Sequence, residues 1–297
     1  MSDSHFKKGI ILAAGKGTRL RPLTRAFGKQ LLPVYDKPMI YYPIDMLINL
    51  GVTDILLIIN EHDHPLYEKL IGNGADFGIN IQYAFQSVPR GIPDAYIVGK
   101  EFIGDDQAIL LLGDNIFYPS EPVCDALKTY QGGGLIFGME VDNPQAFGIA
   151  EVDENGKVLS LEEKPKEPKS NLAVVGLYVF DNRAQHIAGT LEPSARGELE
   201  VVDVMKPYLE TGELSLVNIT SEDSIWFDCG VYESLLEASL FVNQRESITG
   251  RKIGCLEESA YKNGRISLEQ LIHVSQKLPD ISYRRYLERL IASEQGK

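Results

Sequence analysis

Short apolar runs alternate with amphipathic stretches up to about residue 142, and this alternation constrains the fold more than any other feature of the sequence. Strands of a parallel sheet are buried on both faces, so each reads as a nearly continuous apolar run. Successive parallel strands are joined by crossovers that usually contain a helix. The alternation therefore predicts an α/β protein with a Rossmann-like, mostly parallel sheet flanked by helices. The runs expected to form its strands are residues 9–14, 55–59, 81–85, 108–112 and 135–141.

Proline and glycine mark the expected ends of two helices in this region. Pro38 precedes residues 39–50, and Gly51 follows them. Proline is favoured at the start of a helix and glycine just past its end, so these residues predict a helix between them. Residues 66–71, closed by Gly72, are expected to form a second helix.

The pattern changes after residue 142. Asn155 and Gly156 separate two strand-like runs, which is a strong hairpin signal. We therefore predict a main domain of residues 1–250, with an α/β part (1–142) and a β-rich part (143–250), and a small helical appendage of residues 251–297. The further expected elements are hairpin strands at 148–153 and 157–162, a strand at 172–180, a helix at 232–243, and two helices within 267–293 separated by Pro279.

Charge and cysteine content exclude several classes of protein. A net charge of −13 argues against binding to nucleic acid or to an anionic membrane, because those surfaces require clustered Lys and Arg. The apolar runs are far shorter than a membrane span. Cys124, Cys229 and Cys255 are scattered without CxxC spacing, which is typical of reduced thiols and predicts a cytoplasmic protein.

A glycine-rich segment follows the first expected strand. It runs from Leu12 through Ala13, Ala14, Gly15, Lys16, Gly17 and Thr18 to Arg19. Small residues let backbone amides approach a phosphate closely, and Thr18 and Arg19 add a hydroxyl group and a fixed positive charge. The spacing matches neither the dinucleotide fingerprint nor the Walker A loop. The segment therefore predicts a phosphate site of another kind, although an ordinary tight turn remains an alternative.

Two distant carboxylates could form a metal site. Asp114 follows the run at 108–112, at the sheet edge where ligands of such folds bind. Asp228 follows a strand-like run at 224–227. If the fold brings both together, they provide a minimal Mg²⁺ site that phosphate oxygens and waters complete. The alternative for Asp228 is helix capping. Lys29 lies ten residues after Arg19, in a loop from which it could fold back to meet a triphosphate.

Several segments resemble the signature of the sugar-1-phosphate nucleotidyltransferases, and most of all those that use glucose 1-phosphate and dTTP. The resemblance covers nearly the whole chain, in the expected order. The matching segments are residues 15–20 (GKGTRL), 29–43 (KQLLPVYDKPMIYYP), 111–115 (LLGDN), 161–165 (LEEKP), 197–200 (GELE) and 226–228 (WFD).

This resemblance implies Mg²⁺-dependent transfer of a nucleotidyl group from dTTP to glucose 1-phosphate, with release of pyrophosphate. It implies that Arg19 and Lys29 hold the pyrophosphate, that Asp114 and Asp228 hold Mg²⁺, and that Lys164 aligns the sugar phosphate. The implied nucleotide-binding residues, in the part up to 142, are Leu12, Ala13, Ala14, Gly15, Gly17, Thr18, Arg19, Lys29, Gln86, Gly91 and Asp114. The implied sugar-binding residues are Asn115, Gly148, Glu163, Lys164 and Val174, most of them in residues 143–250.

Some positions depart from the family pattern and leave alternatives open. Residues 90–95 differ beside the expected base pocket, and Val175 and Cys229 stand where threonine is common. A sister enzyme using UTP, CTP, GTP or an amino sugar phosphate, or an inactive sugar-nucleotide sensor, therefore remains possible. The resemblance also implies a homotetramer. Residues 257–262 resemble a second, regulatory nucleotide site, with Lys262 where arginine is usual.

Overall fold

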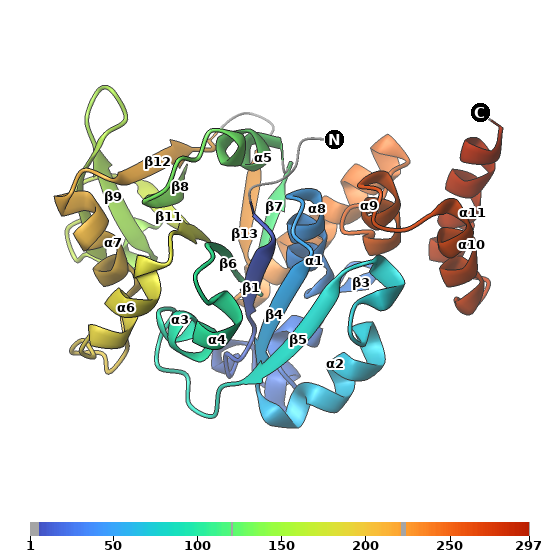
Figure 1. The fold of residues 1–297 in the computed structure, drawn as a ribbon, viewed down its shortest axis with the longest axis horizontal. Helices are drawn as coiled ribbons and strands as arrows, with labels where there is room; N and C mark the ends of the chain where they lie inside the picture. The colour runs from blue at the N-terminus through green and yellow to red at the C-terminus, as the bar shows by residue number, and fades with distance from the viewer. Residues whose placement is uncertain (1–5, 120, 221–223, 297) are drawn as a thin grey trace.

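The computed structural model describes residues 6–119, 121–220 and 224–296, so the first five residues of the predicted main domain lie outside the described part. A nine-stranded sheet forms the centre of the molecule (Figure 1). Its strands are β1 (Lys8–Leu12), β4 (Asp54–Ile59), β5 (Asn80–Phe85), β6 (Ala108–Leu112), β8 (Gly134–Glu140), β9 (Gly148–Val152), β10 (Val158–Glu163), β11 (Leu172–Phe180) and β12 (Leu214–Asn218).

Four parallel strands in the order β6-β1-β4-β5 form the core of this sheet. Leu12 pairs with Ile58 on one side and Leu112 on the other, so the carboxyl ends of these strands meet at one edge. β11 is antiparallel to β6 and also joins β8 and β9. The predicted hairpin is β9 and β10, with Gly156 at a φ of 79° in its turn. The predicted mostly parallel α/β sheet is confirmed.

Helices cover both faces of the sheet, and the apolar residues of β1 alternate between the two cores. Ile11 packs with the helices of one face and Ile10 with those of the other. The first group is α1 (Tyr41–Asn49), α2 (His64–Ile71), α5 (Glu121–Lys128) and α9 (Leu256–Lys262); the second is α3 (Asp94–Val98), α4 (Lys100–Ile103), α6 (Arg183–Thr190) and α7 (Val201–Glu210).

The bounds of three predicted helices were wrong, and in one of them, α2, the helix begins at His64 rather than at residue 66. α1 begins at Tyr41 rather than at residue 39, because Pro38 lies in the short strand β3 (Lys37–Pro38), which pairs with β2 (Pro33–Val34). The helix expected at 232–243 is α8 (Tyr232–Thr249), which continues to the left-handed Gly250.

A separate two-stranded ladder carries one of the predicted carboxylates. β7 (Asn115–Tyr118) continues from the loop after β6 and pairs antiparallel with β13 (Ile225–Asp228). In this register Asp228 lies opposite Asn115. The ladder therefore brings Asp228 to the carboxyl edge of the main sheet.

The C-terminal segment forms the two predicted helices, α10 (Leu268–Lys277) and α11 (Ser282–Gln295), on either side of Pro279. They lie at the end of the molecule opposite β9 and α7 (Figure 1). Leu271 and Leu287 belong to the same apolar cluster as one face of the main sheet. The domain boundary at residue 250 stays a prediction. None of the described helices is both long and apolar enough to cross a membrane.

Candidate active site

The glycine-rich loop after β1 is held by its own contacts. Ala13 donates its backbone N–H to the carbonyl of Ile58 at 2.7 Å, and the side chains of Ala13 and Ala14 are buried. Gly17 has a φ of 55°, and a Cβ there would lie 2.9 Å from Cγ2 of Thr24. Thr24 in turn donates its hydroxyl to the Gly17 carbonyl at 2.6 Å. Only glycine fits this position without strain, which leaves the loop open for a ligand.

Two carboxylates and two cationic side chains meet beside this loop. Asp114 follows β6 and Asp228 ends β13, and their carboxyl groups lie close enough for each to shift the pKa of the other. Lys29 forms an ion pair with Asp114. A Cβ added at Gly230 would lie 2.6 Å from Nη2 of Arg19 and 3.0 Å from Oδ1 of Asp228, so the Arg19 guanidinium lies close to Asp228. The residues that the sequence predicted to converge on a triphosphate and its metal therefore lie together.

Burial and neighbouring charge set the protonation of the two carboxyl groups. Burial raises the pKa of Asp228 to about 6, with a further contribution from the charge of Asp114. Burial also acts to raise the pKa of Asp114, but the ion pair with Lys29 outweighs it and lowers that pKa. Asp228 is not a helix cap, since α8 begins after Val231 without a side-chain cap. The contact of Asp228 with the start of α8 is made by its backbone carbonyl, which accepts the Ser234 hydroxyl at 2.5 Å.

Glu163 and Lys164 lie where β10 ends, and both line the same pocket as Asp114 and Asp228. A Cβ at Gly148 would lie 3.1 Å from Oε2 of Glu163, so a larger residue here would push this carboxylate from its position. Burial raises the pKa of Glu163, and Arg196 donates to it at 3.3 Å. Lys164 has a left-handed φ of 45°, an uncommon conformation for a residue other than glycine. Such strain often marks a functional position.

A pocket of about 350 Å³ joins these groups. Most of the predicted site residues line it: Leu12, Gly15, Arg19, Lys29, Gln86, Gly91, Asp114, Asn115, Gly148, Glu163, Lys164, Val174 and Asp228. Ala13, Ala14, Gly17 and Thr18 do not line it; the first two point into the core, and Thr18 is exposed to solvent. These four can act only through the backbone or after a movement of the loop.

Several lining residues had no predicted role. Gln30 is buried, and its Oε1 has no hydrogen-bond partner within the described part of the chain. Glu198 also lines the pocket, and Phe147 packs edge-on against Trp226 with ring centroids 5.2 Å apart. Gln30, Glu198 and Trp226 lie inside segments that carry the family resemblance, and this membership was the only signal that could have identified them.

Two predicted amide ligands have partners of their own. The Oδ1 of Asn115 accepts the Gly176 N–H at 3.1 Å and the Trp226 Nε1–H at 2.7 Å, which ties β7 to β11 and β13. The Nε2 of Gln86 donates to Oδ2 of Asp94 at 2.5 Å. The Nδ2 of Asn115 also donates to Oδ1 of Asp114 at 3.5 Å, so both ends of this amide have partners, whereas for Gln86 the donor end is engaged.

The unusual residues Val175 and Cys229 place no side chain in the pocket. Val174 lines the pocket, and Val175 points to the opposite face of β11, where it is buried in the apolar core. Cys229 is buried in a third apolar cluster with Val34 and Ile116. These two departures from the family pattern therefore alter the core and leave the pocket wall unchanged.

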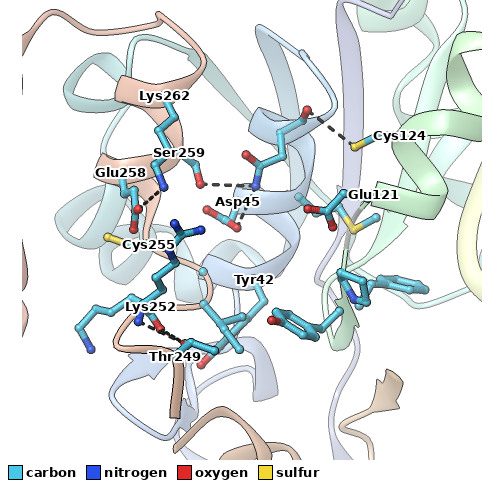
Figure 2. A pocket seen from close by; sticks show the side chains of 18 residues that line it. Tyr42, Asp45, Glu121, Cys124, Thr249, Lys252, Cys255, Glu258, Ser259 and Lys262 are labelled. Atoms are coloured by element: carbon cyan, nitrogen blue, oxygen red, sulfur yellow. Dashed lines mark hydrogen bonds and ion pairs between the residues drawn. The ribbon is translucent and has the colours of Figure 1, made fainter. Parts of the chain in front are cut away.

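A second pocket, of about 760 Å³, is lined by residues of α1, β7 and the segment 249–262. Figure 2 shows Tyr42 and Asp45 of α1 facing Glu258, Ser259 and Lys262 of α9. Its further charged residues are Glu121, Arg251 and Lys252. Three of the six residues that resemble a regulatory site, Glu258, Ser259 and Lys262, thus line a cavity.

Comparisons with known proteins first define the class. Residues 8–245 match the family model described as "Nucleotidyl transferase". A glucose-1-phosphate thymidylyltransferase of Neisseria meningitidis is 49% identical over 96% of this chain and 99% of its own length. One of Mycolicibacterium smegmatis is 46% identical over 97% of this chain and all of its own length. A crystal structure from Bacillus anthracis, assigned to the same enzyme and bound to sucrose, is 37% identical with a TM-score of 0.73 over 79% of this chain and 94% of its own.

The chain is thus a nucleotidyltransferase. More particularly, it belongs to the family of glucose-1-phosphate thymidylyltransferases. The resemblance found in the sequence is confirmed. Nucleotidyltransferases of this family generally use a divalent metal.

Proposed function

We propose that this enzyme joins dTTP and glucose 1-phosphate to give dTDP-glucose and pyrophosphate. The observation that carries the proposal is the pairing of Asp228 with Asn115 across the β7–β13 ladder. The two carboxylates and the cations Arg19, Lys29 and Lys164 line the same pocket, which supports the proposal. A nucleoside triphosphate and a sugar phosphate can therefore meet in one pocket, with charge arranged for both.

The reaction is an in-line displacement. A phosphate oxygen of glucose 1-phosphate attacks the α-phosphorus of dTTP, and a new P–O bond forms. The bond from this phosphorus to the bridging oxygen of the β-phosphate breaks, and its electron pair leaves with pyrophosphate. Arg19 and Lys29 stabilise the departing charge, Lys164 aligns the attacking phosphate, and Glu163 orients the glucosyl ring. Such a transfer needs positioning and charge, so no nucleophilic side chain is required.

Asp114 and Asp228 fit a Mg²⁺ ion. Carboxylates in this number, together with substrate phosphates and water, are the usual ligands of Mg²⁺ in such enzymes. Burial and the charge of Asp114 raise the pKa of Asp228, so the two carboxyl groups repel each other when both are ionised. A divalent cation would relieve this repulsion. When bound, it supplies positive charge against the phosphate oxygens.

Pyrophosphate release across a panel of substrates tests the proposal. The panel pairs dTTP, UTP, CTP and GTP with glucose 1-phosphate and glucosamine 1-phosphate, with Mg²⁺ present or replaced by EDTA. We expect the highest kcat/KM for dTTP with glucose 1-phosphate, and no turnover in EDTA. A higher value for another pair would identify a sister enzyme. Tight nucleotide binding without pyrophosphate release would identify a sensor.

Variants of the carboxylates sharpen this test. Asp228→Asn keeps the shape of the side chain but removes its charge, and we expect at least a 100-fold loss in kcat, equal to about 3 kcal/mol of barrier. Asp181→Asn is the matched control, because Asp181 pairs with Arg183 outside the pocket. Turnover of Asp228→Asn close to that of the control would contradict the assigned role.

A second proposal concerns the appendage, residues 251–297, and the pocket of Figure 2. Arg251, Lys252 and Lys262 supply cations suited to a nucleotide diphosphate. We expect dTDP-glucose to inhibit from this pocket, and Lys262→Met to weaken the inhibition without changing basal turnover. Lys277→Met is the control, since Lys277 is a similarly exposed lysine on α10. Inhibition that is only competitive with dTTP, and unchanged in Lys262→Met, would rule the site out.

We also propose a homotetramer in the cytoplasm. Tyr232, Leu236 and Leu240 are exposed at successive turns of α8 and form an apolar stripe on which another copy can pack. Light scattering should give a mass four times the 33.0 kDa of the chain. A monomer mass would contradict this assembly.

A further inference from the structure

A buried carboxylate holds the side chain that is expected to read the base. Gln86 follows β5 at the carboxyl edge of the sheet, where its backbone N–H bonds the carbonyl of Ile59 at 3.0 Å. It lines the active-site pocket and is nearly inaccessible to solvent. Asp94, the first residue of α3, is only 1% exposed and accepts the Gln86 Nε2–H at 2.5 Å. Asp94 is one of the positions where this chain departs from its family's usual pattern.

The charge of Asp94 determines which way the Gln86 amide faces. An amide has a donor end and an acceptor end, and it can normally exchange them by turning over. An ionised carboxylate accepts hydrogen bonds but donates none. If Gln86 turned over, its Oε1 would face Oδ2 of Asp94, and two buried acceptors would be left opposed without a proton between them. Such an arrangement is costly away from water. The carboxylate therefore holds the Nε2 end and leaves Oε1 as the acceptor.

Arg90 keeps Asp94 in this role from the outside. Its Nη2 forms an ion pair with Oδ1 of Asp94, and its own side chain is 55% exposed. A buried carboxylate needs such a partner to remain charged. The two oxygens of Asp94 are thus divided, with Oδ1 bound to a cation at the surface and Oδ2 bound to the amide at the pocket.

We infer that Asp94 is a specificity-determining positioning residue that makes Gln86 select pyrimidines with a protonated N3 and reject cytosine. Thymine and uracil present an N3–H donor, which the fixed Oε1 of Gln86 accepts. Cytosine presents an acceptor at N3 and a donor at N4, so it requires the reversed amide. Because the Asp94 carboxylate disfavours the reversed amide, cytosine would face a Gln86 side chain with the wrong hydrogen-bonding end. Specificity then comes from weakening the binding of the wrong base. This role rests on the proposed function, since it concerns the base of the nucleotide substrate.

The test compares dTTP, UTP and CTP in Asp94→Asn. Asparagine has nearly the same shape, but it can either accept from Gln86 or donate to it, so both orientations become possible. We expect the ratio of kcat/KM for CTP to that for dTTP to rise at least tenfold. The KM for glucose 1-phosphate should stay within twofold. Asp94→Ser is a second variant with the same ambivalence, in case Asp94→Asn does not fold.

Arg90→Lys is the matched control. It changes the same loop but keeps a cation that can pair with the Asp94 carboxylate facing Gln86, so the CTP to dTTP ratio should stay within twofold of wild type. An unchanged ratio in folded Asp94→Asn or Asp94→Ser would overturn the role. An equal rise in Arg90→Lys would also overturn it, because loop destabilisation would then explain the effect.

The same ratios are measured as Kd values by calorimetry, which does not require turnover. Absence of pyrophosphate release with every nucleotide would therefore refute the proposed function alone. In that case the Kd ratios of the variants would still decide whether Asp94 controls the choice of base.

Discussion

Replacing Lys29 with methionine should destabilise the protein as well as inactivate it. Lys29 pairs with Asp114, and their side chains are only 14% and 10% exposed. Without Lys29, two adjacent carboxylates remain, with Arg19 as the nearby cation. Removing one partner of a buried pair costs about 3–5 kcal/mol, because the other charge is left uncompensated. For 297 residues the entropy of unfolding is roughly 0.6 kcal/mol/K, so Lys29→Met should lower Tm by about 5–8 °C.

The loss of stability should depend on pH with a definite sign. Burial raises the pKa of Asp228 to about 6 from an ordinary value of 3.8. The folded protein therefore binds a proton more tightly than the unfolded chain, and stability falls as pH rises from 3.8 through 6. Removing Lys29 takes away a charge that favours the ionised carboxylate. The Tm difference between wild type and Lys29→Met should therefore be larger at pH 8 than at pH 5.

Thermal unfolding in EDTA measures this effect without bound metal. Adding Asp228→Asn to Lys29→Met should recover at least half of the lost Tm at pH 8, because one of the two carboxylates is then neutral. Lys277→Met serves as the control for loss of a lysine at the surface. A Tm difference that is the same at both pH values and unaffected by Asp228→Asn would refute the reasoning. Such a result would mean that the positive charge of Lys29 does not stabilise the ionised forms of Asp114 and Asp228.

Three further predictions concern single positions around the pocket. Lys164→Gly should raise the free energy of unfolding, measured by chemical denaturation, by about 1 kcal/mol, because glycine adopts the left-handed backbone without strain. The same change should lower kcat/KM for glucose 1-phosphate at least 100-fold, and a lower free energy of unfolding would argue against strain at this position. Gly91→Ala should cost about 2–4 kcal/mol, since a Cβ there would lie 2.1 Å from the Leu199 carbonyl at a φ of 110°; an unchanged Tm would contradict this. Burial raises the pKa of Glu163, so wild type should lose stability as pH rises through that pKa, and Glu163→Gln should abolish this part of the pH dependence of Tm.

Local patterns in the sequence were sufficient to predict most of the architecture. Apolar runs predicted the parallel strands, because strands buried on both faces leave that pattern in a short window. Asn155 and Gly156 predicted the hairpin for an equally local reason. The start of α1 was wrong because Pro38 suits both a first helical residue and an extended strand. Its pairing with Pro33 decided between them, and that pairing is a tertiary contact.

The convergence of the two carboxylates had a different origin. Asp114 and Asp228 are more than a hundred residues apart, and the ladder that joins them has only four residues in each strand. No periodicity in the sequence predicts such a pairing. From the residues alone, a metal site was therefore predicted only on the condition that the fold brings the two carboxylates together. The family resemblance supplied the expectation, and the register of β7 and β13 supplies the physical cause.

Asn115 and Gln86 show what sequence cannot provide even when it identifies a residue correctly. Both line the pocket, as predicted, but the chemistry each offers depends on which end of its amide is already bonded. The acceptor of Asn115 is occupied by Gly176 and Trp226, and its Nδ2 donates one hydrogen to Oδ1 of Asp114 at 3.5 Å, so the second N–H of its NH₂ group is what it can offer a ligand. Gln86 has the opposite arrangement, because Asp94 holds its donor and leaves the acceptor. Two amides of similar chemistry thus present opposite ends to the same pocket. Which end each presents depends on its hydrogen-bond partners. Those of Asn115 are distant in sequence, and that of Gln86 is a residue unusual for the family.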